Sequence, residues 1–353
     1  MSASQVDIRE QIDPAVLMPL LLDTRGRTGG GGADERTVGR DLAIEAVGLE
    51  RRFGSFVAVD KVDLAVRRGE IYGFLGPNGA GKSTTCRMLC TLTAPSGGRA
   101  TVAGHDVARE PDAVRLRIGA ALQANALDYQ QTGTELLRQQ GRYYGLTRSE
   151  IDERLASLRE LVDIGDALDQ RIKGYSGGMK RRIDLAAALI HNPEVLFLDE
   201  PTTGLDPASR AKVWAEVRCL NSELGMTIFL TTQYLEEADA LADRVGIIDH
   251  GRIVAEGTPE ELKRSIGADL VLVQVDDVDV ARRAAAAVPG IEAVEIHGDE
   301  LRVATADGPA TVSPIAVALA EAGVRVRALT LREPTLDDVF LTLTGNRLQE
   351  EGE

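Results

Sequence analysis

Residues 76–83 are Gly76-Pro77-Asn78-Gly79-Ala80-Gly81-Lys82-Ser83, with the compact apolar segment Ile71–Leu75 before them and a helical pattern after them. This strand, loop and helix order fits the spacing G-x4-G-K-[ST] of a phosphate-binding loop. Its glycines let backbone N–H groups curl around phosphate oxygens, and the positive end of the following helix faces the same anion. We therefore predict that residues 76–84 bind a nucleotide, with Lys82 on the β- and γ-phosphates, the Ser83 hydroxyl on Mg²⁺, and Thr84 beside them.

Two acidic residues follow a second apolar strand. The segment Val195–Leu198 runs directly into Asp199 and Glu200. Open α/β sheets bind ligands at the carboxyl ends of their strands, and successive strand residues point in opposite directions. We expect Asp199 to hold the Mg²⁺ shell and Glu200 to orient or deprotonate an attacking water. An Asp-Glu pair alone is usually an ordinary surface feature, but the apolar strand and the phosphate-binding loop favour a catalytic role.

A second possible anion site begins at Ser176-Gly177-Gly178-Met179, before a helical pattern that ends at His191. Ser176 is a good N-cap, and the two glycines leave N–H groups open at the positive end of a helix. Taken alone, a Ser-Gly-Gly run is a weak signal that usually marks only a helix cap.

Composition excludes several classes of protein. The chain has 353 residues, 40 of them basic and 55 acidic, for a net charge of −15. Nucleic acids and anionic lipids are bound by basic surfaces, so we expect no nucleic-acid partner. No apolar run approaches the roughly 20 residues that span a bilayer, and the acidic start predicts no secretion signal. Three cysteines show no disulfide or metal spacing, so we predict a soluble cytosolic protein of about two domains.

Changes of pattern along the chain predict its organisation. Period-two alternation from Leu42 to Val66 is typical of an antiparallel meander, helical patterns fill Thr134–Asp169, and Asp249-His250-Gly251 predicts a hairpin turn. After Lys263 the order of strands and helices is β-α-β-β-α-β, the ferredoxin-like plan. The predicted parts are a disordered leader (1–40), an α/β nucleotide-binding domain (41–264) with a helical subdomain (about 125–190), an accessory βαββαβ domain (265–345) and a tail (346–353).

Taken together, these motifs resemble the ATP-binding subunit of an ABC transporter from about Leu42 to Lys263. Pro201-Thr202-Thr203-Gly204-Leu205-Asp206-Pro207 is similar to that family's D-loop, Gln123 falls at its Q-loop, and Phe53 falls where an aromatic ring stacks on adenine. The resemblance implies a P-loop NTPase fold: a RecA-like core, an antiparallel β subdomain and a helical signature subdomain. The segments that resemble the daunorubicin-resistance type of exporter are Tyr175–Met179, Thr231–Asp239, Asp249–Gly251 and Glu333–Leu341.

The family implies a working arrangement as well as a fold. Two copies of such a subunit enclose ATP head to tail, so that Ser176, Gly177, Gly178 and Asp206 of one copy reach the nucleotide of the other. Gln123 would contact Mg²⁺ and connect the γ-phosphate to a separately encoded membrane permease. The expected activity is ATP hydrolysis that drives export of a hydrophobic drug or lipid-like compound, at the cytoplasmic side of the cell membrane.

Two positions depart from the general family pattern. Gln233 stands where most members have His, and an amide cannot exchange a proton at neutral pH. We therefore assign proton transfer to Glu200 alone and expect Gln233 to sense the γ-phosphate. Met179 ends the signature where Gln is common, which removes one polar side chain.

Several alternatives stay open. Phe53 is nearly as well explained as a core aromatic, Gln123 alone would be a surface amide, and the charges of Lys180–Arg182 are more typical of a solvated helix face than of a nucleic-acid patch. The alternative function is a non-transport or weakly hydrolysing ABC-type regulatory module. A translation-type ABC ATPase would carry two motif sets, a chromosome ATPase a long coiled coil, and a GTPase an N-K-x-D motif, none of which is found.

Overall fold

The structure, a computed structural model, describes residues 41–122, 127–161, 165–267, 269–332 and 334–344. The chain divides between Thr258 and Pro259 into two compact units. The predicted disordered leader (1–40), the predicted tail (346–353) and Gln123 lie outside the described residues. No helix within the described ranges is long and apolar enough to cross a membrane.

The first unit is built on a six-stranded sheet in the order β10-β9-β3-β8-β7-β6. Strands β9, β3, β8, β7 and β6 run parallel, and β10 pairs antiparallel with β9 in the predicted hairpin. The strands are β3 (Ile71–Leu75), β6 (Ile118–Ala121), β7 (Val195–Asp199), β8 (Thr227–Thr232), β9 (Arg244–Asp249) and β10 (Arg252–Gly257). The helices packed on them are α2 (Lys82–Leu89), α3 (Pro111–Arg115), α6 (Gly177–Leu189), α7 (Pro207–Leu224) and α8 (Leu235–Leu241).

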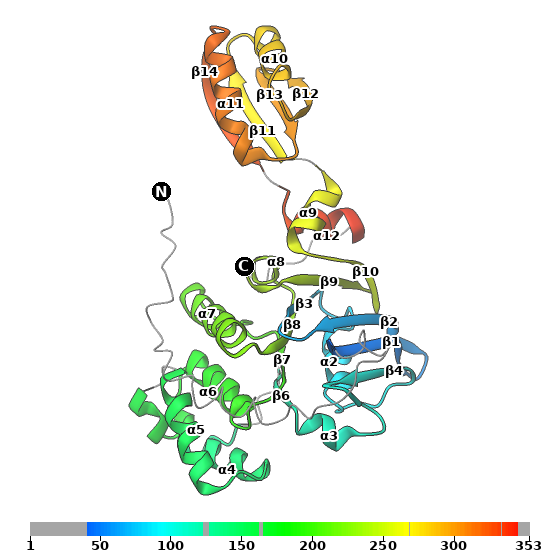
Figure 1. Cartoon of the computed structure of the whole chain (residues 1–353), viewed down its shortest axis with the longest axis vertical. Helices are drawn as coiled ribbons and strands as arrows, with labels where there is room; N and C mark the ends of the chain where they lie inside the picture. Colours follow the sequence, from blue (N-terminus) through cyan, green and yellow to red (C-terminus); the bar gives the residue numbers. More distant parts are fainter. Residues whose placement is uncertain (1–40, 123–126, 162–164, 268, 333, 345–353) are drawn as a thin grey trace, which may run out of the picture. The chain divides into compact units, whose positions relative to one another are not determined.

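Strand β7 shows why the central strands are apolar throughout. Val195 and Phe197 belong to a core shared with α2, whereas Leu196 and Leu198 belong to a core shared with α6 and α7. Figure 1 shows α6 and α7 on one side of this sheet and α2 on the other. Parallel strands are covered on both faces, so each strand is a continuous apolar run. The polar residues at the ends of the strands are where the chemistry of the site can lie.

The segment before the phosphate-binding loop forms the predicted antiparallel sheet. Its order is β2-β1-β4-β5, and its two short strands come from a segment after α2 that the sequence pattern did not predict. The strands are β1 (Leu42–Phe53), β2 (Phe56–Arg67), β4 (Gly97–Val102) and β5 (His105–Asp106).

The predicted helical subdomain, about 125–190, contains α4 (Gly133–Tyr143), α5 (Arg148–Leu161) and α6. Helix α4 begins with a capping box, in which Thr132 Oγ1 accepts from Glu135 N and Glu135 Oε2 accepts from Thr132 N. Such reciprocal capping satisfies two backbone donors and fixes where the helix starts.

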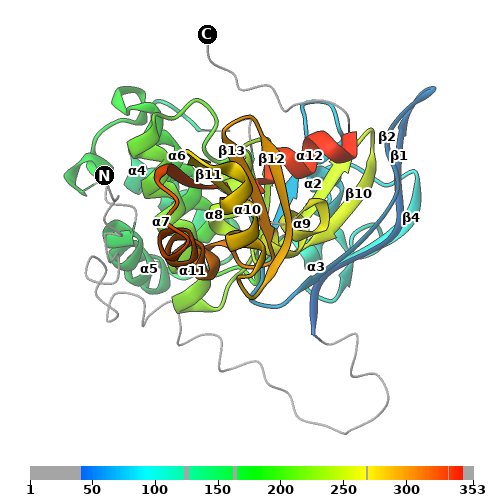
Figure 2. The same cartoon turned by 90° about the horizontal axis from the view of Figure 1, so that it is seen from above.

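The second unit has the predicted ferredoxin-like plan. Its four strands are all antiparallel, in the order β12-β13-β11-β14. Helices α10 and α11 lie side by side on one face of this sheet, and Figure 2 shows the same pair from above. The elements are α9 (Pro259–Ile266), β11 (Asp269–Val275), α10 (Val278–Ala286), β12 (Ile291–His297), β13 (Glu300–Thr305), α11 (Gly308–Glu321), β14 (Val326–Arg332) and α12 (Leu336–Thr344). Helices α9 and α12 pack against each other.

His191, which is half-buried, connects the end of α6 to the sheet. Its Nε2–H donates to the Ile118 carbonyl at 2.9 Å, and its ring stacks on Tyr144 with centroids 3.5 Å apart. Burial, helped by the Arg154 charge, lowers the pKa of His191 to about 4. The imidazole is therefore neutral in the folded protein at neutral pH, which fits a structural role.

Replacing His191 is expected to change how stability depends on pH. The unfolded chain binds a proton at His191 below about pH 6.5, whereas the folded chain does so only near pH 4, so this residue destabilises the fold as pH falls between them. The free energy of unfolding of His191→Gln minus that of the parent should therefore rise by about 1.4 kcal/mol per pH unit on acidification. Urea unfolding at several pH values measures it, with His250→Gln as the exposed control. A pH-independent difference would contradict the assignment.

Candidate active site

The phosphate-binding loop lies between β3 and α2, wedged against two other strands. A β-carbon on Gly76 would lie 2.3 Å from the Ile248 carbonyl oxygen, and one on Gly81, whose φ is +110°, would lie 2.5 Å from that of Ala58. Only glycine fits at either position, because the space excludes a side chain at both and the backbone conformation excludes one at Gly81 as well. This close packing holds the loop against β2 and β9, beside the cleft that Asn78, Gly79 and Gly81 line.

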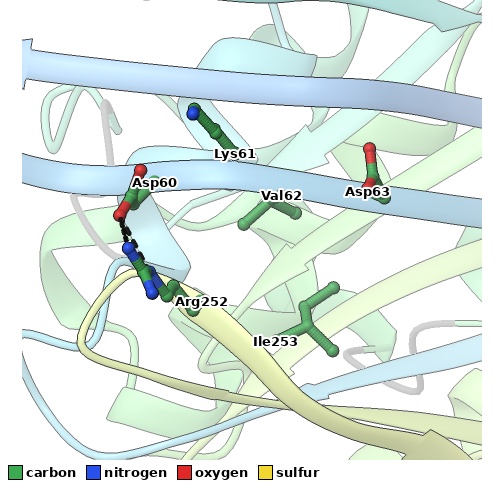
Figure 3. Close-up of a pocket in the computed structure, with 6 residues that line it drawn as sticks. All are labelled: Asp60, Lys61, Val62, Asp63, Arg252 and Ile253. Atoms are coloured by element: carbon green, nitrogen blue, oxygen red, sulfur yellow. Dashed lines mark hydrogen bonds and ion pairs between the residues drawn. The ribbon is translucent and has the colours of Figure 1, made fainter.

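A network outside the cleft fixes the loop against β2. Gly251 N donates to the Ala80 carbonyl at 2.9 Å, and Asp60 N donates to the Gly251 carbonyl at 2.8 Å. Arg252 donates twice to one oxygen of Asp60, at 2.8 and 2.6 Å, beside a pocket of about 490 Å³ between β2 and β10 (Figure 3). The hydrogen bond from Arg252 lowers the pKa of the Asp60 carboxyl. Strand β2 therefore keeps its place beside the loop through both backbone and ion-pair contacts.

Lys82 is held inside the loop that precedes it. Its ammonium group donates to the carbonyl oxygens of Gly76 at 2.7 Å and Pro77 at 3.1 Å, and lies 3.4 Å from Glu200 Oε1. Burial lowers the pKa of Lys82, and the charge of Glu200 opposes this shift. A cation fixed at this point can attract the terminal phosphates of a nucleotide at little cost in side-chain entropy.

Ser83 and Asp199 provide oxygen atoms suited to a magnesium ion. Ser83 Oγ donates to Asp199 Oδ1 at 3.1 Å, and Thr231 Oγ1 donates to the same oxygen. Mg²⁺ prefers oxygen ligands and usually keeps waters and substrate phosphates in its shell. The described residues contain no group of three or more His, Cys, Asp or Glu that could hold a metal alone. This donor set therefore fits Mg²⁺ that arrives with a nucleotide rather than a cage made only of protein ligands.

Glu200 leaves the strand in a strained conformation. Its φ is +49°, in the left-handed region, which costs a non-glycine residue about 1–2 kcal/mol. Its N–H donates to the Thr231 carbonyl at 3.0 Å, and its carboxylate accepts from Thr203 Oγ1 at 3.5 Å in addition to facing Lys82. The two neighbouring acids thus have different partners, with Asp199 beside Ser83 and Glu200 beside Lys82.

Lys82, Ser83 and Glu200 line one cleft of about 490 Å³, and Asp199, which does not line it, is joined to it through Ser83. Gln233 follows β8, is buried and lines the same cleft. The structure therefore brings together most of the predicted loop, Glu200 and Gln233, which are far apart in the sequence. The lining residues are Phe56, Ala58, Asn78, Gly79, Gly81, Lys82, Ser83, Thr84, Glu200, Thr203 and Gln233.

The signature segment lies elsewhere, next to the start of α7. Ser176 caps α6 by accepting from Met179 N at 3.2 Å, and Asp206 caps α7 by accepting from Ser209 N at 3.0 Å. A β-carbon built on Gly178 would lie 3.6 Å from Ser209 Oγ, so the two helix starts are neighbours. Hydrogen bonds from Ser209 lower the pKa of Asp206. Neither residues 176–178 nor Asp206 are among the described residues that line the cleft.

The two aromatic residues at the β1–β2 turn are placed differently. Phe53 and Phe56 are paired across the hairpin, and the Arg51 guanidinium covers Phe53 at 4.5 Å from its ring centre. Phe56, which the sequence analysis did not single out, lines the cleft and is 61% exposed. Phe56 stands only three residues after Phe53, so the sequence offered both aromatic rings as candidates. Only the structure shows that Phe56, and not Phe53, lines the cleft.

Comparison with known proteins agrees with this architecture. The family model described as "ABC transporter" matches residues 59–203, and "ATP-binding protein DrrA1-3-like, C-terminal domain" matches residues 257–344. The daunorubicin/doxorubicin resistance ATP-binding protein DrrA of Streptomyces peucetius is 47% identical over 86% of this chain and 93% of its own length. The chain belongs to the DrrA-type ATP-binding subunits of ABC transporters.

Two further comparisons extend this assignment. The Nod factor export ATP-binding protein I of a Rhizobium species is 40% identical over 88% of this chain and 99% of its own length. A solved ATP-binding subunit of an ABC transporter has a TM-score of 0.58 and 28% identity, and the match covers 63% of this chain and 92% of that one. The family resemblance and the P-loop fold predicted from the motifs are confirmed, and as a family member the chain is an ATPase that binds ATP.

Proposed function

We propose that this chain hydrolyses ATP to drive the export of a hydrophobic drug or lipid-like compound through a separate membrane permease. The main support is the cleft that unites the phosphate-binding loop with Glu200 and Gln233, in a chain that aligns with nearly the full length of a drug-resistance subunit. The proposed location is the cytoplasmic face of the membrane, through contact with the permease. A weakly hydrolysing regulatory module, the alternative weighed above, has less support, because the contacts between Lys82 and Glu200 and between Ser83 and Asp199 favour hydrolysis.

Each residue of the cleft has a proposed task. The loop amides and Lys82 bind the phosphates, and Ser83 and Asp199 hold Mg²⁺, which when bound would neutralise charge on the β- and γ-phosphates. Glu200 accepts the proton of the attacking water, while Gln233 donates a hydrogen bond to the γ-phosphate. Gln123, which the family pattern places on Mg²⁺, keeps that role in the proposal.

The starts of α6 and α7 lie away from the cleft, and this supports a pair of chains. Ser176–Gly178 and Asp206 lie away from the cleft of their own chain, yet both belong to motifs expected to contact nucleotide. A second copy arranged head to tail would bring them to the open side of the first copy's cleft. Each of the two ATP molecules would then be bound by the loop of one chain and the signature of the other.

We propose that the adenine base stacks on an aromatic ring at the end of the β1–β2 hairpin, where Phe53 and Phe56 pair. Replacing the ring that stacks on adenine should weaken ATP binding about 10-fold, since base stacking contributes roughly 1–3 kcal/mol. Equilibrium titration with a fluorescent ATP analogue compares Phe53→Ala and Phe56→Ala. Weaker ATP binding by Phe53→Ala supports Phe53, the residue predicted from the family, as the platform. Weaker binding by Phe56→Ala alone assigns the platform to Phe56, which lines the cleft. Unchanged affinity in both variants and in the double variant would contradict the assignment.

The permease is proposed to dock in a groove of about 300 Å³ between α4, α6 and β6. Leu92, which is 55% exposed, forms part of this groove with Leu127 and Tyr144, and Arg115 also lines it. An amphipathic helix of the permease that lays its apolar face on these residues would match the mainly apolar surface. Leu127 stands four residues after Gln123, so the groove is close in sequence to the predicted link to the γ-phosphate.

Affinity purification from detergent-solubilised membranes tests the proposed function. The tagged full-length chain should recover a polytopic membrane protein, and Leu92→Asp should lose it while retaining ATP binding. Leu116→Asp, which replaces an exposed leucine outside the groove, is the control and should keep the partner. Recovery of no membrane protein by the parent chain would contradict the transporter assignment.

A further inference from the structure

Arg181 is an unexpectedly buried cation in the middle of the fold. The run of three charges at Lys180–Arg182 predicts a solvated helix face. This prediction is wrong for Arg181, because its side chain is only 11% exposed. Burial lowers the pKa of Arg181, and an ion pair with Asp184 at 3.4 Å opposes this shift. Its guanidinium donates to four backbone carbonyls, those of Pro201 (3.1 Å), Leu122 (3.3 Å), Ala121 (3.3 Å) and Asp199 (3.4 Å).

These carbonyls stand on both sides of the proposed catalytic base. Asp199 comes directly before Glu200 and Pro201 directly after it, while Ala121 ends the neighbouring strand β6. Arg181 itself is on α6, five residues after the Ser176 cap of the signature helix. One side chain thus joins the signature helix to the backbone around Glu200.

A buried carboxylate contacts the same turn through the Thr202 side chain. Glu237, on α8, is fully buried, and its Oε1 accepts from Thr202 Oγ1 at 2.8 Å and from Trp214 Nε1 at 3.0 Å. Burial raises the pKa of this carboxyl, and its hydrogen bonds oppose the shift. Glu237 stands four residues after Gln233 in the segment that follows β8, so this segment connects the proposed γ-phosphate sensor to the turn behind Glu200.

The turn needs such support because Glu200 is strained. A left-handed conformation of a non-glycine residue persists only where its surroundings over-determine it. We infer that Arg181 and Glu237 are positioning residues: Arg181 holds the backbone of the Pro201–Thr202 turn and Glu237 holds the Thr202 hydroxyl, so that the Glu200 carboxylate faces the cleft. The same contacts link Glu200 to the signature helix on one side and to Gln233 on the other. This inference rests on the assignment of Glu200 as the base in the proposed function.

Steady-state ATPase kinetics of the full-length chain test the inference. Arg181→Gln removes most of the guanidinium contacts, and Thr202→Val removes one hydroxyl with almost no change of shape. We expect kcat to fall about 10-fold or more in Arg181→Gln and about 5-fold in Thr202→Val, with KM for ATP within 3-fold, since a factor of 10 corresponds to about 1.4 kcal/mol in the barrier. Glu237→Leu should behave like Arg181→Gln, and Glu237→Gln, which keeps the accepting oxygen, should recover most of kcat.

A structural control separates positioning from simple loss of stability. Arg244 is also partly buried and contacts the Ala65 carbonyl, Glu70 and Glu256, but it lies outside the cleft and the turn. Arg244→Gln should lower the melting temperature with kcat within 2-fold of the parent. The inference fails if Thr202→Val keeps the parental kcat, or if Arg244→Gln loses as much kcat as Arg181→Gln. Thr202→Val decides the matter if Arg181→Gln does not fold, and inactivity of the parent chain itself would refute the proposed function instead.

Discussion

Glu200→Gln is expected to lower the rate of ATP hydrolysis at least about 100-fold, the usual contribution of a positioned general base. The amide has the same shape and can still accept from Thr203, so the fold and the cleft should survive. Because ATP binds but is not hydrolysed, the variant should accumulate an ATP-stabilised dimer. Phosphate release measures the rate, and light scattering with and without ATP measures the mass.

The matched control is Glu194→Gln, an acidic residue at the surface that pairs with Arg68 and Arg117 away from the cleft. It should retain the parental rate. If Glu200→Gln hydrolyses ATP at the parental rate, Glu200 is not the base. If it loses activity but remains monomeric with ATP, the assignment of the base stands and the proposed head-to-tail pair loses its support.

Lys82→Met is expected to weaken ATP binding about 100-fold or more and to reduce hydrolysis to background, because a buried charge-assisted contact to phosphate is lost. Lys173→Met, at an exposed position, removes the same charge and should change neither property. Isothermal titration with ATP measures the affinity, and the matched loss of charge distinguishes the specific contact from a general electrostatic effect. Parental affinity in Lys82→Met would contradict the role of the loop.

The same variant tests whether sites are shared between chains. Ser176→Arg should also be inactive, because it blocks the signature helix start, yet its phosphate-binding loop is intact. Mixing it with Lys82→Met creates mixed pairs that contain one complete site, so about a quarter of the parental rate should return when chains pair at random. If the mixture stays inactive while each variant still dimerises with the parent chain, the shared-site arrangement is wrong.

Local motifs were predictable from the sequence because a short segment decides them. The loop at residues 76–83 and the acids Asp199 and Glu200 each follow an apolar strand, and the strand dictates where they emerge. The second unit was equally accessible, since its strands and helices alternate at regular spacing with one buried face per strand, as in β11. Strand β6 and helix α8 were missed because four and seven residues carry too little periodicity to stand out.

The contacts that complete the site depend on the fold as a whole. Arg181 stands in a run of three basic residues that is typical of a solvated surface, and only the packing of α6 on the strand ends buries it. Glu237 is one of two adjacent glutamates, and nothing in its local sequence shows that Thr202 and Trp214 lie around it. Likewise, the hairpin register puts Phe56 at the cleft and leaves Phe53 beneath Arg51.

The central claim is that hydrolysis at Glu200 drives export, and transport itself tests it most directly. Inside-out membrane vesicles that contain the chain and its co-purified permease are given a panel of fluorescent hydrophobic drugs with ATP, and uptake is followed by fluorescence quenching. We predict ATP-dependent accumulation with the parent chain and none with Glu200→Gln at equal protein levels. Equal accumulation with both chains, or accumulation that continues without ATP, would contradict the account.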